Sequence, residues 1–362
     1  MAHYANGLAS GLQPFCKAVV RTPFDYIKPH YASSHLVRAV TYKYNPLYYI
    51  ALALVLSKKD RPDVVHVTSM SSGLLPFLAT LRTLSISTVY TVHDPEPHEE
   101  DDTHWGRLMK LCHYKIEIPI IFRLSTKIHL HSRSFANRLL FQCLRMADRK
   151  IYFAQHGGFP PKDLNANRPK GASPLQRPLT FLFFGRIQPY KGLQILARAF
   201  QLIEQTRNLR LIVAGEGRLP GEILQMYQRS PNLHIINRFL SDDEIPNLMS
   251  QADVVILPYT SATQSGVIPL AYAFGLPVIC TRVGALPEIV LDGQTGVLVQ
   301  PSNAEDLADA MLRFLSNPSL AARMGSQAQD FLRTHLQWQS IAQIHYQQYL
   351  NILNQKAFAH VG

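Results

Sequence analysis

Cysteine is scarce in this chain of 362 residues, and no two cysteines stand close enough to share a short motif. The four are Cys16, Cys112, Cys143 and Cys280, with no CxxC pair among them. This spacing argues against a disulfide framework and against a zinc site. It favours a reducing compartment, so we expect a cytoplasmic protein.

Long apolar runs are also absent. The first residues, MAHYANGLASGLQPF, contain neither a basic segment nor a long apolar core, so the sequence predicts no cleavable signal peptide. The most apolar window of the first half, Pro46 to Leu56, is much shorter than the roughly 20 residues that a membrane-spanning helix needs. Lys58 and Lys59 follow it. We interpret this window as a buried or interfacial helix.

Acidic residues are fewer than basic ones, with 25 Asp/Glu against 36 Lys/Arg and a net charge of +11. Residues 1–160 carry 19 Lys/Arg against 11 Asp/Glu, although six of these acids cluster between Asp94 and Asp102. A basic surface suits nucleic acid or an anionic membrane, and it also occurs on ordinary soluble proteins. No nucleic-acid motif is present. We therefore expect no nucleic-acid partner and keep peripheral contact with an anionic membrane as a hypothesis.

The composition that remains, 47% hydrophobic and 17% charged, is typical of a globular protein with room for two α/β domains. In the first half, strand-like runs alternate with helical stretches, which predicts a parallel, doubly wound sheet. A helix is expected over His3–Leu12 and at 73–82, 105–123 and 133–147. Strands are expected at Lys17–Phe24, Val64–Ser69, Thr88–His93, Lys127–Ser132 and Lys150–His156.

A proline-rich stretch with few large apolar side chains, residues 160–178, is typical of a linker. We therefore expect a first domain at 1–160, a linker at 161–178 and a second domain at 179–335, with a C-terminal helical segment at 336–362. A capping box from Ser302 to Glu305 predicts a helix start. The strands expected in the second half are Thr180–Gly185, Leu209–Ala214, Leu233–Asn237, Val254–Leu257, Val278–Thr281 and Gly296–Val299.

The most informative stretch runs from Ala252 to Glu288 and reads as strand, polar loop, helix and strand. Gly275 is placed as the residue that ends the helix. The loop Thr263-Gln264-Ser265-Gly266 then lies at the carboxyl end of a parallel strand, the edge where open α/β sheets bind ligands. Its N–H groups suit an anion such as a diphosphate. An ordinary tight connection is the alternative.

A second loop at the same sheet edge, Gly185 to Gly192, contains two cations. Gly185 permits close approach of a ligand to the backbone. Arg186 and Lys191 suit a diphosphate. The alternative is a pair of solvated surface cations near a turn.

These residues, together with Gly215-Glu216-Gly217, resemble the donor-binding domain of the retaining GT-B glycosyltransferases, above all glycosyltransferase family 4, group 1. The resemblance implies an α/β fold of two Rossmann-like, doubly wound domains facing a cleft, with the C-terminal helix packing back on the first domain. It implies that Arg186 and Lys191 clamp the diphosphate of a nucleotide sugar, and it places Gly185, Glu216 and the Thr263–Gly266 loop at the donor. It implies a co-substrate but no cofactor and no metal.

The chain departs from the family in two places. The family's two glutamates, eight residues apart, align with Thr263 and Ala271, so both carboxylates are missing. Tyr272 and Glu288 are the candidates to compensate. The family also begins with a strand and a Gly-rich loop, whereas this sequence begins with the helix expected at His3–Leu12.

In the first half, His93 resembles the family histidine that contacts the donor sugar, although a structural role is the alternative. His131-Ser132 and Gln155-His156-Gly157 resemble acceptor-side and cleft-lining positions. The acidic run from His93 to His104 has metal-ligand residue types without regular spacing, and we interpret it as a loop at the cleft mouth.

The resemblance therefore implies a retaining hexosyltransferase that uses a nucleotide-diphosphate sugar and a glycan or lipid-linked acceptor, in polysaccharide or glycolipid synthesis. Its predicted catalytic residues are His93, Arg186 and Lys191. One alternative is a catalytically impaired GT-B scaffold that binds nucleotide or a partner enzyme. A dinucleotide-dependent dehydrogenase is weaker, because no GxGxxG loop follows a first strand.

Overall fold

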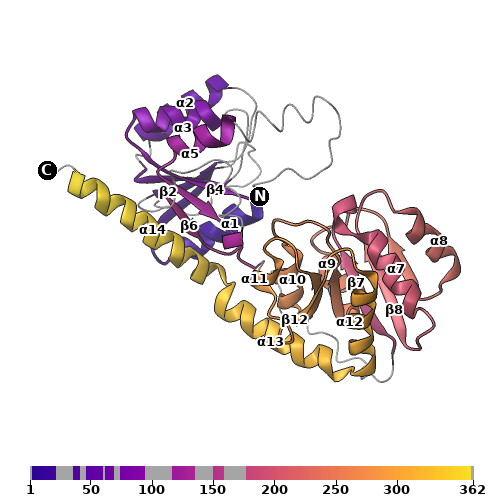
Figure 1. Ribbon diagram of the computed structural model, residues 1–362. Coiled ribbons are helices and arrows are strands. Elements are labelled where there is room, and N and C mark those ends of the chain that lie inside the picture. The colour runs from indigo at the N-terminus through magenta and orange to yellow at the C-terminus, as the bar shows by residue number, and fades with distance from the viewer. Residues whose placement is uncertain are drawn as a thin grey trace. The chain divides into compact units, whose positions relative to one another are not determined.

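The computed structural model describes residues 2–21, 36–40, 46–59, 62–68, 74–93, 116–134, 150–158 and 177–359. The chain forms two compact units (Figure 1). The first unit comprises residues 1–157 and 336–362, and the second comprises residues 158–335.

The first unit contains a sheet of six parallel strands that follow one another in sequence order. Right-handed crossovers that advance in one direction leave their helices on one face of the sheet. Here that face is covered by α2 (Pro46–Lys59), α3 (Leu74–Thr83) and α5 (Ile118–Leu124). The strands are β1 (Lys17–Arg21), β2 (Leu36–Val40), β3 (Val64–Val67), β4 (Ser87–Val92), β5 (Lys127–Leu130) and β6 (Ile151–Phe153).

The other face of this sheet is covered by helices from the two ends of the chain, α1 (Ala2–Leu12) and α14 (Trp338–Ala359). Two glycines of α1 allow the helices to approach. A Cβ on Gly7 would lie 2.1 Å from the Trp338 ring, and one on Gly11 would lie 2.3 Å from the Trp338 carbonyl oxygen. The C-terminal helix is therefore part of the first unit's core.

A row of polar side chains lies beneath α1 and α14, on the side of the sheet opposite to α2, α3 and α5. Along each strand, side chains alternate between the two faces. On β3, Val65 and Val67 face α2, α3 and α5, and His66 between them faces α1 and α14. Thr91 on β4 and His129 on β5 share this face.

The second unit contains another sheet of six parallel strands, in the order β12-β11-β10-β7-β8-β9. After β9 the chain returns to the other side of β7, so the direction of winding reverses between β7 and β10. Opposite winding directions place α7 and α8 on one face and α10 on the other. The strands are β7 (Leu179–Phe184), β8 (Leu209–Ala214), β9 (Leu233–Ile236), β10 (Val254–Leu257), β11 (Val278–Thr281) and β12 (Gly296–Val299).

The helices of the second unit carry apolar faces that are buried against this sheet. In α7, for example, Leu193, Leu196 and Phe200 are buried at helical spacing. Helices α7 and α12 contact each other, and so do α10 and α13. The helices are α7 (Leu193–Ile203), α8 (Gly221–Arg229), α9 (Ile245–Gln251), α10 (Val267–Ala273), α11 (Leu286–Ile289), α12 (Ala304–Ser316) and α13 (Ser319–His335).

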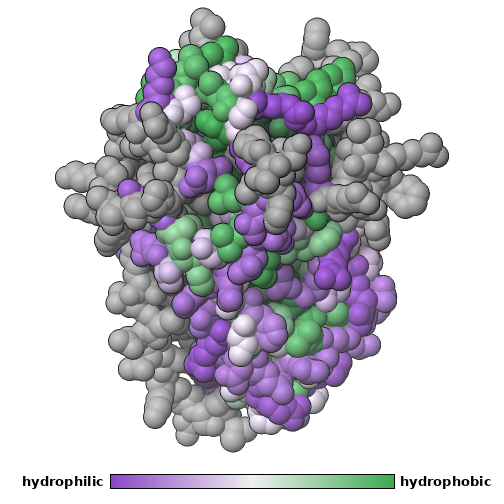
Figure 2. Space-filling view, turned by 90° about the vertical axis from the view of Figure 1, so that its left-hand side faces the viewer, coloured by the Kyte–Doolittle hydropathy of each residue, from purple (hydrophilic) through white to green (hydrophobic). Residues whose placement is uncertain are grey.

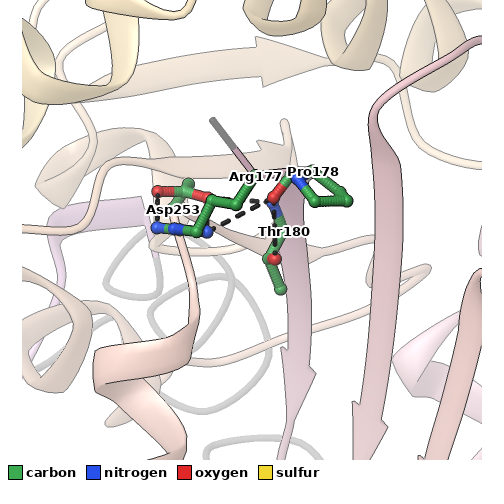
Figure 3. A network of polar contacts seen from close by, with 4 residues as sticks. All are labelled: Arg177, Pro178, Thr180 and Asp253. Carbon is green, nitrogen blue, oxygen red and sulfur yellow. Dashed lines mark hydrogen bonds and ion pairs between the residues drawn. The ribbon is translucent and has the colours of Figure 1, made fainter. Parts of the chain in front are cut away.

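A buried carboxylate fixes the start of β7 to the start of β10 (Figure 3). Asp253 accepts two hydrogen bonds from the Arg177 guanidinium, at 2.7 and 2.8 Å, and a third from the Thr180 N–H at 2.9 Å. Its side chain is 2% exposed. These bonds satisfy a charge that would be costly to bury alone.

The predicted α/β fold with two Rossmann-like units is confirmed, and the second sheet has the doubly wound order. Strand β2 was not predicted, because its sequence has no clear hydrophobic period of its own. The predicted capping box is wrong: Ser302 has φ of 58°, and Asn303 caps α12 by accepting from the Asp306 N–H at 2.9 Å. Most of the helix expected at 133–147, part of that at 105–123 and most of the linker lie outside the described residues.

Helix α2 occupies the apolar window that follows Pro46, as expected. Within the described part of the chain, no helix is both long enough and apolar enough to span a bilayer.

Candidate functional site

The loops that follow β7 and β10 lie on either side of the point where the winding of the second sheet reverses. In open α/β sheets this is the position of the ligand crevice. Gly185 ends β7 with φ of 130°, a value that favours glycine. A Cβ there would lie 4.0 Å from Lys191 Nζ and 3.9 Å from Val267 at the start of α10. The backbone of Gly185, the ammonium group and the start of α10 are thus brought together.

Lys191 connects the two predicted loops. Its Nζ donates a hydrogen bond to the Tyr259 hydroxyl at 2.8 Å and lies 4.1 Å from the centre of the Tyr259 ring. The Tyr259 hydroxyl is 3.5 Å from the Ser265 hydroxyl. Burial lowers the pKa of Lys191. Because it is largely buried, this ammonium group is poorly hydrated. Because Tyr259 holds it in place, it is already positioned to bind an anionic oxygen.

Some of the polar groups in the loop from Thr263 to Gly266 form hydrogen bonds within the protein, and one does not. Ser265 is buried, and its hydroxyl accepts from the Val267 N–H at 3.3 Å, which orders the start of α10. Thr263 is also buried. The Gln264 side-chain oxygen is buried and has no hydrogen-bond partner among the residues that the structure describes. The loop therefore presents one amide oxygen that a ligand hydroxyl could satisfy.

Arg186 and Glu216 lie at the same edge and are both exposed. The Ile187 N–H donates to the Glu216 carbonyl oxygen at 2.8 Å, which ties the loop after β7 to the loop after β8. Arg186 is close enough to lower the pKa of Lys191, after the larger effect of burial. The structure thus brings Gly185, Arg186 and Lys191 together.

Thr263 and Ala271, which stand where the family has its two glutamates, have no carboxylate with which to bind a ligand. Ala271 is fully buried, and so is its neighbour Tyr272. The Tyr272 hydroxyl donates to Thr295 Oγ1 at 2.7 Å, inside the unit. Tyr272 is therefore not the substitute for a ribose-binding glutamate. Glu288 lies in α11 and is half-buried.

Sequence analysis missed a cavity of about 670 Å³ beside these loops. It lies between the segments after β7, β8 and β9 and is lined in part by Gln188, Gly217, Leu224 and Asn237. Asn237 Oδ1 accepts from the Gly217 N–H at 3.2 Å. The volume of the cavity is within the range of small-molecule binding sites. The glycines at 215 and 217 were the only sequence signal for it.

At the carboxyl edge of the first sheet, His93, His131 and His156 follow β4, β5 and β6. His93 Nε2 lies 2.8 Å from the Thr68 carbonyl oxygen, and His93 Nδ1 lies 3.0 Å from His131 Nε2. Burial lowers the pKa of His93 to about 3, so it is neutral at pH 7. Both of its ring nitrogens are thus engaged within the unit. The acidic run after it lies outside the described residues, so the structure does not test that loop.

One group of described residues has the right donors for a metal ion. Ligand nitrogens of His66, His129 and His345 lie within 4.8 Å of one another, and all three side chains are buried. Hydroxyl groups lie between them, however. Thr91 Oγ1 is 2.6 Å from His66 Nε2 and 3.0 Å from His129 Nδ1, and Tyr4 Oη is 3.1 Å from His345 Nε2.

The hydrogen bonds of this histidine group are satisfied without a metal. The carbonyl of Ala154 can only accept, so His129 Nε2–H donates to it at 2.8 Å and His129 Nδ1 accepts from Thr91. Thr91 in turn accepts from His66 Nε2–H, and the other His66 nitrogen accepts from Tyr349 at 2.6 Å. We interpret the group as the hydrogen-bonded link between α14 and the sheet.

Comparison with known proteins places both halves of the chain. The family model described as Glycosyltransferase Family 4 matches residues 4–149, and the one described as Glycosyl transferases group 1 matches residues 178–317. Glycogen synthase from Mycobacterium tuberculosis is 30% identical over 297 residues, which is 80% of this chain and 69% of that protein. D-inositol 3-phosphate glycosyltransferase from Corynebacterium glutamicum is 34% identical over 161 residues, 42% of this chain and 38% of that protein. The chain spans less than half the length of the first curated relatives it matches.

Solved structures of the same architecture are more distant in sequence. Sucrose-phosphate synthase from Thermosynechococcus elongatus has a TM-score of 0.66 at 17% identity and covers 89% of this chain and 90% of its own. HepE from Anabaena, solved in complex with UDP, has a TM-score of 0.67 at 17% identity over 87% and 92% of the two chains. These similarities show the two-domain, Rossmann-like GT-B fold. Together with the family matches, they show that the chain belongs to the group 1 glycosyltransferases of family 4.

Proposed function

We propose that this protein transfers a sugar from a nucleotide-diphosphate sugar to a glycan or lipid-linked acceptor, with retention at the anomeric carbon. The observation that carries the proposal is the Lys191 ammonium group, held by Tyr259 beside the Thr263–Gly266 loop where the second sheet reverses its winding. Solved structures of similar fold contain UDP and UDP-glucose, which supports a nucleotide-sugar donor.

In the proposed reaction, the bond between the anomeric carbon and the diphosphate oxygen breaks, and the acceptor hydroxyl bonds to the same face of that carbon. The acceptor proton passes to the departing diphosphate. Negative charge grows on the diphosphate as the bond breaks, so Lys191 and Arg186 would stabilise the transition state more than the ground state. No protein nucleophile is required.

The cavity of about 670 Å³ beside the diphosphate loops is our candidate for the nucleoside. Its walls come from the loops after β7, β8 and β9, so a base there would extend away from Lys191 along one sheet edge. Because Ala271 is buried and Tyr272 is bonded to Thr295, we assign no side chain to the ribose hydroxyls.

An apolar surface on the first unit supports a lipid-linked acceptor at the inner face of the cytoplasmic membrane. Figure 2 shows apolar side chains near the top of the view. Figure 1 has α2, α3 and α5 at this end of the first unit. Leu54 and Val55 on α2 are 41% and 55% exposed, and Ile116 just before α5 is 57% exposed. Flotation with anionic vesicles should recover the protein at low salt, and a failure to float would remove this part of the proposal.

The second candidate is a scaffold that binds nucleotide without catalysis. The absence of both family carboxylates at Thr263 and Ala271 favours it. The two candidates share the diphosphate site and differ in turnover of the donor. A donor that is bound and never consumed, alone or with glycan and lipid-linked acceptors, would favour the scaffold.

Calorimetric titration with UDP and GDP tests the diphosphate site. One nucleotide should bind to the wild type. Lys191→Met should weaken binding by about 10- to 100-fold, because a charge-assisted hydrogen bond contributes about 1.5–3 kcal/mol. Tyr259→Phe is the matched control, since it keeps the ring and the charge and removes only the hydroxyl. Equal binding by wild type and Lys191→Met would refute the assignment of the site.

A further inference from the structure

The loop after β7 contains a tight turn that packs directly against the end of β10. Residues Pro189–Lys191 form a single turn of 3-10 helix, and the Gly192 N–H donates to the Pro189 carbonyl oxygen at 3.1 Å. Gly192 ends the turn with φ of 69°, in the left-handed region that favours glycine. A Cβ at Gly192 would lie 1.8 Å from the Pro258 carbonyl oxygen. The turn therefore brings the side chain of Tyr190 and that of its neighbour Lys191 close to the residues that follow Pro258.

Hydrogen bonds to the backbone fix two tyrosines in this contact. The Tyr190 carbonyl oxygen accepts from the Thr260 N–H at 2.8 Å and from the Thr260 hydroxyl at 3.3 Å. The Tyr259 carbonyl oxygen accepts from the Thr281 hydroxyl at 2.6 Å, at the end of β11. The two tyrosine rings meet edge to face, with centres 6.2 Å apart. None of these contacts involves Lys191, so both rings are held in place independently of its side chain.

The Lys191 ammonium group lies against both rings. Its Nζ is 4.1 Å from the centre of the Tyr259 ring and 5.4 Å from the centre of the Tyr190 ring. Both distances are within the range of about 6 Å in which a ring attracts a cation, and the attraction is stronger when the cation is poorly hydrated. Burial, the largest influence, lowers the pKa of Lys191, and Tyr190 raises that pKa. Tyr190 therefore favours the charged form that burial disfavours.

Neutral rings take the place that a carboxylate has beside other cations of this unit. Arg177 pairs with Asp253, and Arg282 pairs with Asp292. Lys191 forms no ion pair with any residue that the structure describes. A carboxylate beside Lys191 would neutralise the ammonium group and repel a diphosphate. A ring stabilises the cation and leaves its charge available to a ligand.

We propose that Tyr190 and Tyr259 are positioning residues for the diphosphate, because their rings hold the Lys191 ammonium group in place and charged without a carboxylate. The inference rests on the proposed function, since it assumes that Lys191 binds the diphosphate of a nucleotide. It adds two side chains that the resemblance to the family does not place at the donor. The rings act through Lys191 and do not need to touch the ligand.

Two substitutions of Tyr190 separate its ring from its hydroxyl. The readout is the affinity gained when the diphosphate is added to the nucleoside, from calorimetry with UDP and uridine, or with GDP and guanosine if GDP is the nucleotide that binds. Tyr190→Leu should reduce this gain about 3- to 30-fold, the equivalent of about 0.7–2 kcal/mol. Tyr190→Phe keeps the ring and should retain most of the gain. Equal losses in both variants, or no loss in Tyr190→Leu, would overturn the proposal.

A double-mutant cycle tests whether the rings act through Lys191. A residue that acts only through Lys191 has no effect once the ammonium group is gone. In the Lys191→Met background, Tyr190→Leu and Tyr259→Leu should therefore each change the gain by less than about twofold. The same loss with and without Lys191 would show a role in packing alone and would overturn the proposal.

The fold of each variant is checked separately, because Tyr259 is 0% exposed whereas Tyr190 is half-buried. Affinity for the nucleoside close to that of the wild type shows that the second unit is intact. Tyr227→Leu is the matched control: it removes a tyrosine ring from α8 that is 51% exposed and should leave the gain unchanged. A loss in this control as large as that in Tyr190→Leu would count against the proposal.

This proposal and the proposed function fail in different ways. If neither UDP nor GDP binds to the wild type, the proposed function itself has failed. If a nucleotide binds and Lys191→Met weakens its binding while neither leucine variant does, the diphosphate site stands and the two rings are not its positioning residues.

Discussion

The first unit should unfold in mildly acidic solution, well before the second. Six histidines of the first unit are held neutral, five in its interior and one, His156, half-buried at its edge: His66, His93, His129, His131, His156 and His345. Burial, the largest cause in each case, lowers their pKa values, to about 3 for His93 and His129. Lowering the pH therefore tests whether the stability of the first unit depends on keeping these histidines neutral.

The direction and size of the effect follow from proton binding. Between the lowered pKa values and about 6.5, the unfolded chain binds more protons than the folded one, so stability is complete above pH 6.5 and falls as the pH drops below it. At pH 5.5, each histidine would remove about 1.4 kcal/mol. Six of them remove about 8 kcal/mol, which is comparable to the entire stability of a typical domain, about 5–15 kcal/mol.

Tryptophan fluorescence reports on this unit alone, because both tryptophans, Trp105 and Trp338, belong to it. We expect an unfolding midpoint near pH 5–5.5 by fluorescence, while circular dichroism retains the helical signal of the second unit. In that unit, burial lowers the pKa of His234, which is mostly exposed, so acid should affect the unit much less at pH 5.5; the carboxyl of Glu244, with its pKa lowered to about 2, loses its contribution only at lower pH. Equal urea stability at pH 7.5 and pH 5.5 by fluorescence would refute the reasoning.

Three further outcomes are expected. Asp253→Ala should destabilise the second unit by about 3 kcal/mol, because it removes the buried acceptor of three hydrogen bonds and leaves the Thr180 N–H without that partner. Asp330→Ala, which breaks an exposed pair, should cost about 0.3 kcal/mol. Urea unfolding followed by circular dichroism compares them, and similar losses would contradict the account of Figure 3. Gly7→Ala should destabilise the first unit by roughly 2–3 kcal/mol, since its methyl group would lie 2.1 Å from the Trp338 ring; an unchanged fluorescence midpoint in urea would show that α1 does not pack as described. Cys280 is buried and its thiol pKa is raised by burial, so iodoacetamide should label it at pH 8 only after denaturation, as peptide mass spectrometry can determine.

Much of the second unit could be predicted from its sequence, because its strands are short, uniformly apolar and separated by clear turn residues. Val254–Leu257, Val278–Thr281 and Gly296–Val299 were predicted to the residue. Gly275, with φ of 66°, follows α10 as expected. Local apolar runs and turn residues are sufficient to predict these strands, so no knowledge of long-range contacts was needed.

The first unit was harder because its polar residues are paired across long sequence distances. His66 meets Tyr349, and Tyr4 meets His345, so neither contact has a local pattern. The engagement of both His93 nitrogens likewise depends on Thr68 and His131, which follow two other strands, β3 and β5. A histidine at the end of a strand predicts a position in the sheet, but the proton that it carries is set by partners that only the fold brings together.

Because α14 covers one face of the first sheet, the order of synthesis affects how this protein folds. Residues 1–157 leave the ribosome with that face covered by α1 alone, and its other partner, α14 with Ile341, Tyr349 and Ile352, is made only after the whole second unit. At about 5–20 residues per second, the wait is roughly 10–40 seconds. During that interval, the nascent first unit exposes the part of this face that α14 later covers, including His66, which meets Tyr349 in the complete fold, a surface that chaperones would be expected to recognise.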